Sequence, residues 1–131
     1  MTVQAFTRPH VKLAAADIPA VVTSHNSGSK LVFSKGFDQP VLIKQIAIGR
    51  LEPGESIEPH VHPDMDEHYF ILQGTGTMRI NKDNYSLKSG DFILVTAGSE
   101  HELHCENNRL EFYYQGFEIL SAEKTSQMFK G

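Results

Sequence analysis

The sequence predicts an all-β fold of the sandwich or barrel type, and three observations support this prediction. From Lys30 onward, short segments rich in Val, Ile, Phe and Tyr are separated by Gly, Pro or Asn about every 8–12 residues, a spacing typical of sandwiches and barrels. The chain has 131 residues, the usual size of one domain. Its 40% apolar and 21% charged residues are ordinary for a globular protein. We therefore expect residues 1–131 to form one all-β domain.

The expected elements begin with an irregular N-terminal segment. Residues 12–22 contain Leu13, three alanines and Ile18 before Pro19, which predicts a short helix or a loop packed on the barrel. The strands are expected at residues 30–33, 41–51, 57–62, 67–72, 77–81, 85–87, 92–95, 100–105 and 110–117. Turn residues such as Gly54 separate them, because glycine accepts a positive φ at low cost. Residues 121–131 are mixed and polar, which predicts a short helix or a frayed tail.

Charge and cysteine content narrow the function classes. Twelve Lys and Arg against 16 Asp and Glu give a formal net charge of -4, so no overall positive field attracts nucleic acid. The lone Cys105 excludes an internal disulfide and fits a reducing cytosol. Residues 1–12 contain no apolar run of signal-peptide length, and no later stretch approaches the roughly 18 apolar residues of a membrane-spanning helix. We expect a cytoplasmic protein with no nucleic-acid or membrane partner.

Four residues form a candidate metal site. His60 and His62 are two positions apart on an expected strand, so both project from one face about 7 Å apart and can converge on one ion. Glu67 opens the next strand, and His101 begins a late strand that can return beside the first. Three imidazoles and one carboxylate suit a divalent transition metal (Fe, Mn, Ni, Co, Cu or Zn) and leave positions for water or substrate.

The same residues carry a resemblance to a known family. The first motif is Gly54, five residues, His60-Val61-His62, four residues, Glu67, six residues and Gly74. The second is Gly90, five residues, Thr96-Ala97-Gly98, two residues and His101. Together, at 54–74 and 90–105, they resemble the two motifs of small single-domain members of the cupin superfamily. The resemblance implies a small antiparallel, jelly-roll-like β-barrel in which His60, His62, Glu67 and His101 bind the metal.

Two positions depart from the family pattern. Thr96 stands where the family usually has Pro, and Cys105 stands where it usually has Asn. Neither position is normally a ligand, so the implied ligand set is unaffected. Cys105 shares strand parity with His101, which makes it a candidate catalytic thiol, although a small buried core residue is the alternative interpretation. Tyr69 shares parity with Glu67 and is the second candidate acid or base.

Strand alternation also sorts the remaining side chains near the site. Tyr69 and Ile71 are expected to line the pocket, whereas Phe70 and Leu72 face the other way. Apolar side chains on an outer face favour a homodimer, or a cover formed by the N-terminal segment. Arg79, Arg50 and Lys44 are the cations available for an anionic substrate. Arg79 alternates with Met78 and Ile80, so it points away from the pocket if those two residues face it.

These features lead to two principal hypotheses of function. An open divalent site favours an enzyme, namely an isomerase, lyase or decarboxylase, or an oxygenase, that acts on a small polar or anionic metabolite. The alternative is a sensor or storage protein that binds a small molecule on the metal without converting it. A third interpretation makes the metal a structural clip, whose removal would unfold the protein.

Overall fold

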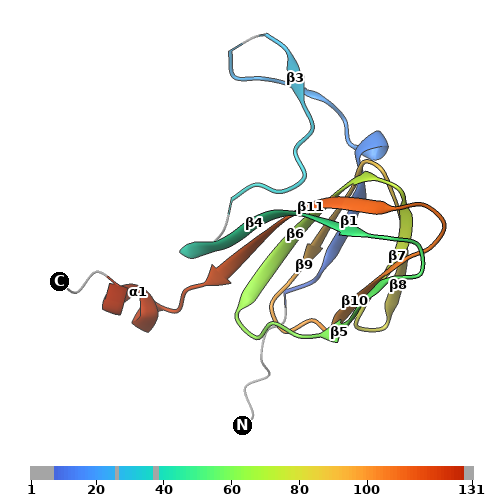
Figure 1. The fold of residues 1–131 in the computed structure, drawn as a ribbon. Coiled ribbons are helices and arrows are strands. Elements are labelled where there is room, and N and C mark those ends of the chain that lie inside the picture. The colour runs from blue at the N-terminus through green and yellow to red at the C-terminus, as the bar shows by residue number, and fades with distance from the viewer. Residues whose placement is uncertain (1–7, 26, 37–38, 129–131) are drawn as a thin grey trace.

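Antiparallel β-strands make up most of the computed structural model, which describes residues 8–25, 27–36 and 39–128 (Figure 1). The elements are β1 (Val11–Ala14), the 3-10 helix η1 (Ala15–Asp17), β2 (Val21–Val22), β3 (Ser29–Lys30), β4 (Val41–Leu51), β5 (Ser56–His60), β6 (Met65–Gln73), β7 (Thr75–Ile80), β8 (Asp83–Lys88), β9 (Asp91–Val95), β10 (His101–Cys105), β11 (Leu110–Ile119) and α1 (Ala122–Met128).

Two sheets form the body of the fold. One has the strand order β1-β9-β6-β11-β4 and the other the order β5-β10-β7-β8. Neighbours such as β6 and β9 are far apart in sequence, as in a jelly roll. The predicted all-β, jelly-roll-like fold is confirmed. The described strands form two separate sheets that face each other, and not one closed barrel, because no ladder joins their outer strands.

Most strand predictions agree with the structure to within two residues, and β4 has the predicted bounds. The strand expected at 30–33 is wrong beyond Lys30, since β3 ends there and pairs only with β2. The segment that carries β3 extends away from the two sheets (Figure 1). Phe33 instead stacks on Phe92, with ring centroids 5.1 Å apart, and meets Phe70 edge-on at 5.5 Å. The N-terminal segment therefore covers part of the outer face of β6 and β9.

The two ends of the chain differ from the prediction in one respect. Helix η1 provides the short N-terminal helix that was expected, but strand β1 precedes it and pairs with β9 from Val11 to Ala14. Pairing with the free edge of β9 explains this extended conformation, because that edge would otherwise leave backbone groups without partners. At the other end α1 confirms the C-terminal helix, and residues 129–131 of the predicted segment lie outside the described residues.

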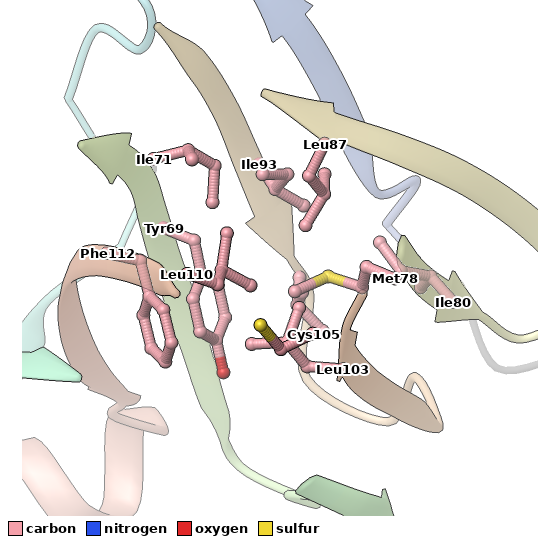
Figure 2. Packing of buried hydrophobic residues seen from close by; sticks show 11 residues of the cluster. Tyr69, Ile71, Met78, Ile80, Leu87, Ile93, Leu103, Cys105, Leu110 and Phe112 are labelled. Carbon is pink, nitrogen blue, oxygen red and sulfur yellow. The ribbon is translucent and has the colours of Figure 1, made fainter. Parts of the chain in front are cut away.

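The hydrophobic core lies between the two sheets. Figure 2 shows Ile71 and Ile93 of the five-stranded sheet packed near Leu87, Met78 and Leu103 of the four-stranded sheet. All five side chains are buried. Their inward positions follow from strand alternation, as the sequence predicts. This packing fixes the distance between the sheets, and the candidate site spans the same gap. Among the described helices, none has the length and apolarity needed to cross a bilayer.

Candidate metal centre

The four predicted ligands come together between the two sheets. His60 ends β5 and His101 begins β10 in the four-stranded sheet, whereas Glu67 lies on β6 in the facing sheet. His62 lies in the connection from β5 to β6. One ligand atom of each side chain lies within 4.8 Å of the others. The structure therefore places the three imidazoles and the carboxylate around one point, as a metal site requires.

His60 and His101 are held as direct neighbours. They are cross-strand partners in the β5–β10 pairing, and their ring centroids are 4.1 Å apart. Nδ1 of His60 donates to the carbonyl of Glu58 at 2.8 Å, and Nδ1 of His101 donates to the carbonyl of Ser99 at 3.1 Å. Because a carbonyl oxygen can only accept, each of these Nδ1 atoms carries a proton. Nε2 is then the atom of each ring that a metal would bind, and in His101 it hydrogen-bonds with Glu67 at 2.8 Å.

His62 and Glu67 complete the cluster from the other side. The strand predicted at 57–62 ends at His60, so His62 reaches the site from a loop and not from a strand. Its backbone carbonyl accepts a hydrogen bond from the amide of Gly98 at 2.8 Å. One carboxylate oxygen of Glu67 lies 2.8 Å from Nε2 of His101 and 3.4 Å from Nε2 of His62. The carboxylate therefore faces two of the three imidazoles.

The protonation states suit a metal. Burial lowers the pKa of His62, and the neighbouring His60 and His101 lower it further, against the opposing effect of Glu67. Burial alone would raise the pKa of Glu67, but its contacts with His101, His62 and Tyr69 outweigh this and lower it. A neutral imidazole and an ionised carboxylate are the forms that ligate a metal. Donor chemistry and donor orientation thus fit a divalent transition metal.

A pocket of about 350 Å³ opens beside the cluster. Besides His60, His62 and Glu67, its lining consists of Gln45, Gly49, Arg50, Leu51, Ile57, Met65, Tyr69, Phe112 and Tyr114. The walls contributed by β4 and β11 were not identified from the sequence. Alternation along 110–117 does indicate that Phe112 and Tyr114 share a face, but not that this face borders the metal ligands. That placement depends on the pairing of β11 with β6, which sets Tyr114 opposite Tyr69.

The two candidate catalytic residues occupy different surroundings. Tyr69 lines the pocket, and its hydroxyl interacts with Glu67. Burial and then the charge of Glu67 raise the pKa of Tyr69 well above its ordinary value, so the hydroxyl stays protonated. Cys105 faces inward with the parity expected, but it lies in the hydrophobic core (Figure 2) and is not part of the pocket lining. Its thiol donates to the carbonyl of Asn108 at 3.0 Å. This placement matches the alternative interpretation of Cys105 as a small core residue.

Each of the three cations that the sequence offers for an anionic substrate forms an ion pair with a glutamate. Arg79 points away and pairs with Glu100 and Glu102 at 2.8 and 2.9 Å, as its alternation with the buried Met78 and Ile80 predicts. Lys44 pairs with Glu118. Arg50 borders the pocket, but its Nε donates to Glu111 at 2.8 Å. An anionic substrate would therefore have to interact mainly with a bound metal.

Comparison with known proteins agrees with this geometry. Residues 47–114, just over half of the chain, match the family model described as "Cupin domain". The curated "Oxalate-binding protein" of Thermotoga maritima is 34% identical over 64 residues, which cover 48% of this chain and 53% of that protein. "Tetracenomycin polyketide synthase protein TcmJ" of Streptomyces glaucescens is 31% identical over 58 residues, which cover 44% of this chain and 39% of that protein. The matches thus span about half of these relatives or less.

The fold is also similar to that of solved structures. The crystal structure of a predicted oxalate decarboxylase from Thermotoga maritima aligns with a TM-score of 0.56 at 22% identity. The alignment covers 88% of this chain and all of that one. At this identity the likeness concerns the fold alone.

Proposed function

The chain belongs to the cupin domain family, and from that premise we propose that it is a metal-dependent enzyme that converts a small metabolite. One observation carries the proposal: three imidazoles and one carboxylate converge on one point, and three of these four side chains, His60, His62 and Glu67, line a pocket of about 350 Å³ through which substrate could reach a bound ion. A divalent transition metal (Fe, Mn, Ni, Co, Cu or Zn) bound there would polarise an oxygen atom of the substrate as a Lewis acid. Isomerase, lyase, decarboxylase and oxygenase chemistry are all compatible with such a site.

The residues of the chain have separate roles in this proposal. His60, His62, Glu67 and His101 hold the ion, and Glu67 supplies the only negative charge of the set. Tyr69 is the candidate catalytic acid. Its protonated hydroxyl lies beside Glu67 in the pocket wall, where it can donate a hydrogen bond to a substrate oxygen as negative charge develops there. Cys105, in the core, is given no role in the reaction.

The pocket walls indicate the kind of substrate. Tyr69 and Tyr114 stack with ring centroids 5.7 Å apart, and Phe112 lies 5.7 Å from Tyr69. Leu51 and Ile57 extend this apolar wall. The pocket is within the range of about 300–1,000 Å³ seen for small-molecule sites. We propose a flat, ring-bearing compound of low charge with one or two oxygen atoms that would bind the metal.

The substrate proposal is tested with a panel of compounds. Protein purified without added metal is analysed for bound elements, loaded anaerobically with Fe(II) or Mn(II), and mixed with hydroxylated aromatic acids or with oxalate. Oxalate belongs in the panel because a relative is named an oxalate-binding protein. We expect conversion of an aromatic compound and little conversion of oxalate, because the walls are apolar and aromatic. Preference for oxalate would contradict the substrate class.

The same experiment separates the alternative functions. Oxygen uptake that depends on one compound indicates an oxygenase, whereas conversion without oxygen uptake indicates an isomerase, lyase or decarboxylase. Compounds that bind tightly and are recovered unchanged with every metal would favour a sensor or storage protein and contradict the enzyme proposal. Chelation of the metal should leave the β-structure intact, because none of the four candidate ligands belongs to the hydrophobic core cluster between the sheets. Unfolding on chelation would favour the structural clip.

Replacing Tyr69 by phenylalanine should lower turnover by about 100-fold, the usual cost of losing one hydrogen-bond donor to developing negative charge, while the metal affinity is retained. The matched control is Tyr114→Phe, which removes a hydroxyl that donates to Gln45 at 3.0 Å in the same pocket. Steady-state kinetics and metal titration of both variants provide the measurement. Equal turnover in wild type and Tyr69→Phe would rule out the acid role.

We also propose a cytoplasmic homodimer, as the sequence predicts. β4 is an outer strand of its sheet and exposes Ile43, Ile46 and Ile48, each more than half exposed. An apolar outer strand with one free edge favours pairing with a second copy. Analytical ultracentrifugation tests the stoichiometry, and a monomer at micromolar concentration would contradict the dimer.

A further inference from the structure

A buried carboxylate next to the metal centre connects two distant parts of the chain. The Asp66 side chain is fully buried, directly before Glu67 on β6. Arg8, which is 58 positions earlier, forms a two-pronged ion pair with it: Nη1 donates to Oδ2 at 2.7 Å, and Nη2 donates to Oδ1. Such bidentate pairs fix geometry as well as charge. The N-terminal segment is thereby tied to the start of β6.

Asp66 and Arg8 also form hydrogen bonds with the turn at residues 96–99, which precedes His101. The amide of Ala97 donates to Oδ1 of Asp66 at 2.8 Å. From the other side, the hydroxyl of Thr96 donates to the carbonyl of Arg8 at 2.8 Å. Thr96 stands where the family usually has proline, which has no hydroxyl to donate. This link is therefore a feature of the present sequence that the family pattern does not provide.

The 96–99 turn in turn contacts two of the histidines. The amide of Gly98 donates to the carbonyl of His62 at 2.8 Å. The carbonyl of Ser99 accepts the hydrogen bond from Nδ1 of His101 at 3.1 Å and so orients that ring. Since Asp66 directly precedes Glu67, the network reaches three of the four candidate ligands through hydrogen bonds or chain continuity.

We propose that Arg8, Asp66 and Thr96 form a strap that positions the metal ligands, with Arg8 and Thr96 as positioning residues. This inference rests on the metal site of the proposed function. The physical reason is the burial of Asp66: among the described residues Arg8 is the cation that forms an ion pair with its carboxylate, and a buried charge that loses its ion-pair partner forces its surroundings to rearrange toward water. Asp66 also accepts the hydrogen bond from the amide of Ala97 in the 96–99 turn, so the rearrangement displaces this turn and with it the supports of His62 and His101.

The test compares two ion pairs on the same N-terminal segment. Arg8→Met breaks the strap, and Thr96→Val keeps the ion pair but removes the hydroxyl. The control is Lys12→Met, because Lys12 also pairs with a fully buried carboxylate, Asp91 at 3.6 Å. Asp91 keeps a second ion pair with Lys88 at 3.3 Å, and it does not contact the 96–99 turn in any hydrogen bond of the described residues. Binding of Co(II) is measured by its visible absorption spectrum and by titration, with thermal unfolding of the metal-free proteins alongside.

If the strap positions the ligands, its variants should lose more Co(II) affinity than thermal stability. Arg8→Met should weaken Co(II) binding about 10-fold, the lower end of the cost of losing an outer-shell partner, because Arg8 acts on the ligands only through Asp66 and the 96–99 turn. Thr96→Val should weaken it about two- to tenfold, because it removes the hydroxyl's hydrogen bonds with Arg8 and with Ser99. Lys12→Met should lower the unfolding temperature but leave the affinity and the spectrum unchanged. Equal Co(II) affinities in wild type and both strap variants would overturn the proposal.

A second measurement separates failure of the strap from failure of the metal site. In metal-free protein, amide hydrogen exchange of Ala97 and Gly98 should be faster in Thr96→Val than in wild type or Lys12→Met. Unchanged exchange would contradict the strap even if wild type binds cobalt. A wild-type protein that binds no cobalt would refute the proposed function, and with it the role of the strap toward the metal. Thr96→Val preserves the ion pair between Arg8 and Asp66. It therefore tests whether the strap positions the ligands even if Arg8→Met does not fold.

Discussion

Glu67→Gln is expected to abolish tight metal binding, with a loss of roughly 100-fold or more in affinity. Losing an outer-shell partner usually costs 10–100-fold, and Glu67 is itself the candidate anionic ligand. Glutamine has nearly the same shape but no charge, so the three imidazoles would remain as the only strong donors. The contacts of Glu67 with His101 and His62 lower its pKa, which keeps the carboxylate ionised near neutral pH. Metal content after purification and Co(II) titration provide the measurement.

Glu58→Gln is the matched control for this substitution. Glu58 is exposed two positions before His60, and its backbone carbonyl, which the substitution leaves in place, accepts the hydrogen bond from that ring. The same chemical change there should leave metal binding intact. If Glu67→Gln retains the wild-type affinity, or if both variants lose it equally, the carboxylate is not a ligand and the proposed centre is wrong.

Gly74→Ala is expected to cause the largest loss of stability, about 2–5 kcal/mol, by adding overpacking to the cost of a positive φ. Gly74 has a φ of 88° in the turn between β6 and β7. A Cβ atom there would lie 2.0 Å from the carbonyl oxygen of Arg109 and 2.9 Å from Cα of Leu110. Both contacts are with backbone, so the start of β11 would have to move. Urea unfolding measures the change.

Gly54→Ala isolates the backbone contribution. Gly54 has the same φ of 88°, but a Cβ atom there meets nothing within 4 Å. It should therefore lose only about 1–2 kcal/mol, the cost of the left-handed conformation for a residue other than glycine. Similar losses in the two variants would show that backbone conformation, and not the contact with Arg109, requires glycine at position 74. Both glycines belong to the same sequence motif, yet only the structure distinguishes their roles.

Local pattern and tertiary structure contributed differently to the site. The spacing of His60, His62, Glu67 and His101 was sufficient to select the four residues that the structure brings within 4.8 Å. Strand alternation correctly predicts that the side chain of Arg79 points outward and that of Tyr69 points inward. The same reasoning placed Cys105 inward, but it could not tell the core from the pocket, because both lie on the inner face of a strand.

The sequence by itself determined the strand-rich architecture, the glycine turns and the identity of the clustered histidines and glutamate, since these depend on periods of two residues and on local turn chemistry. Tertiary structure decided what no local period encodes. It set Tyr114 opposite Tyr69 through strand pairing, packed Phe33 on Phe92, and joined Arg8 to Asp66 across 58 positions. The physical reason is that the packing of the whole core selects the register of paired strands and the side chains that meet between the two sheets. In this packing, contacts between residues distant in sequence outweigh the local conformational preferences of the chain.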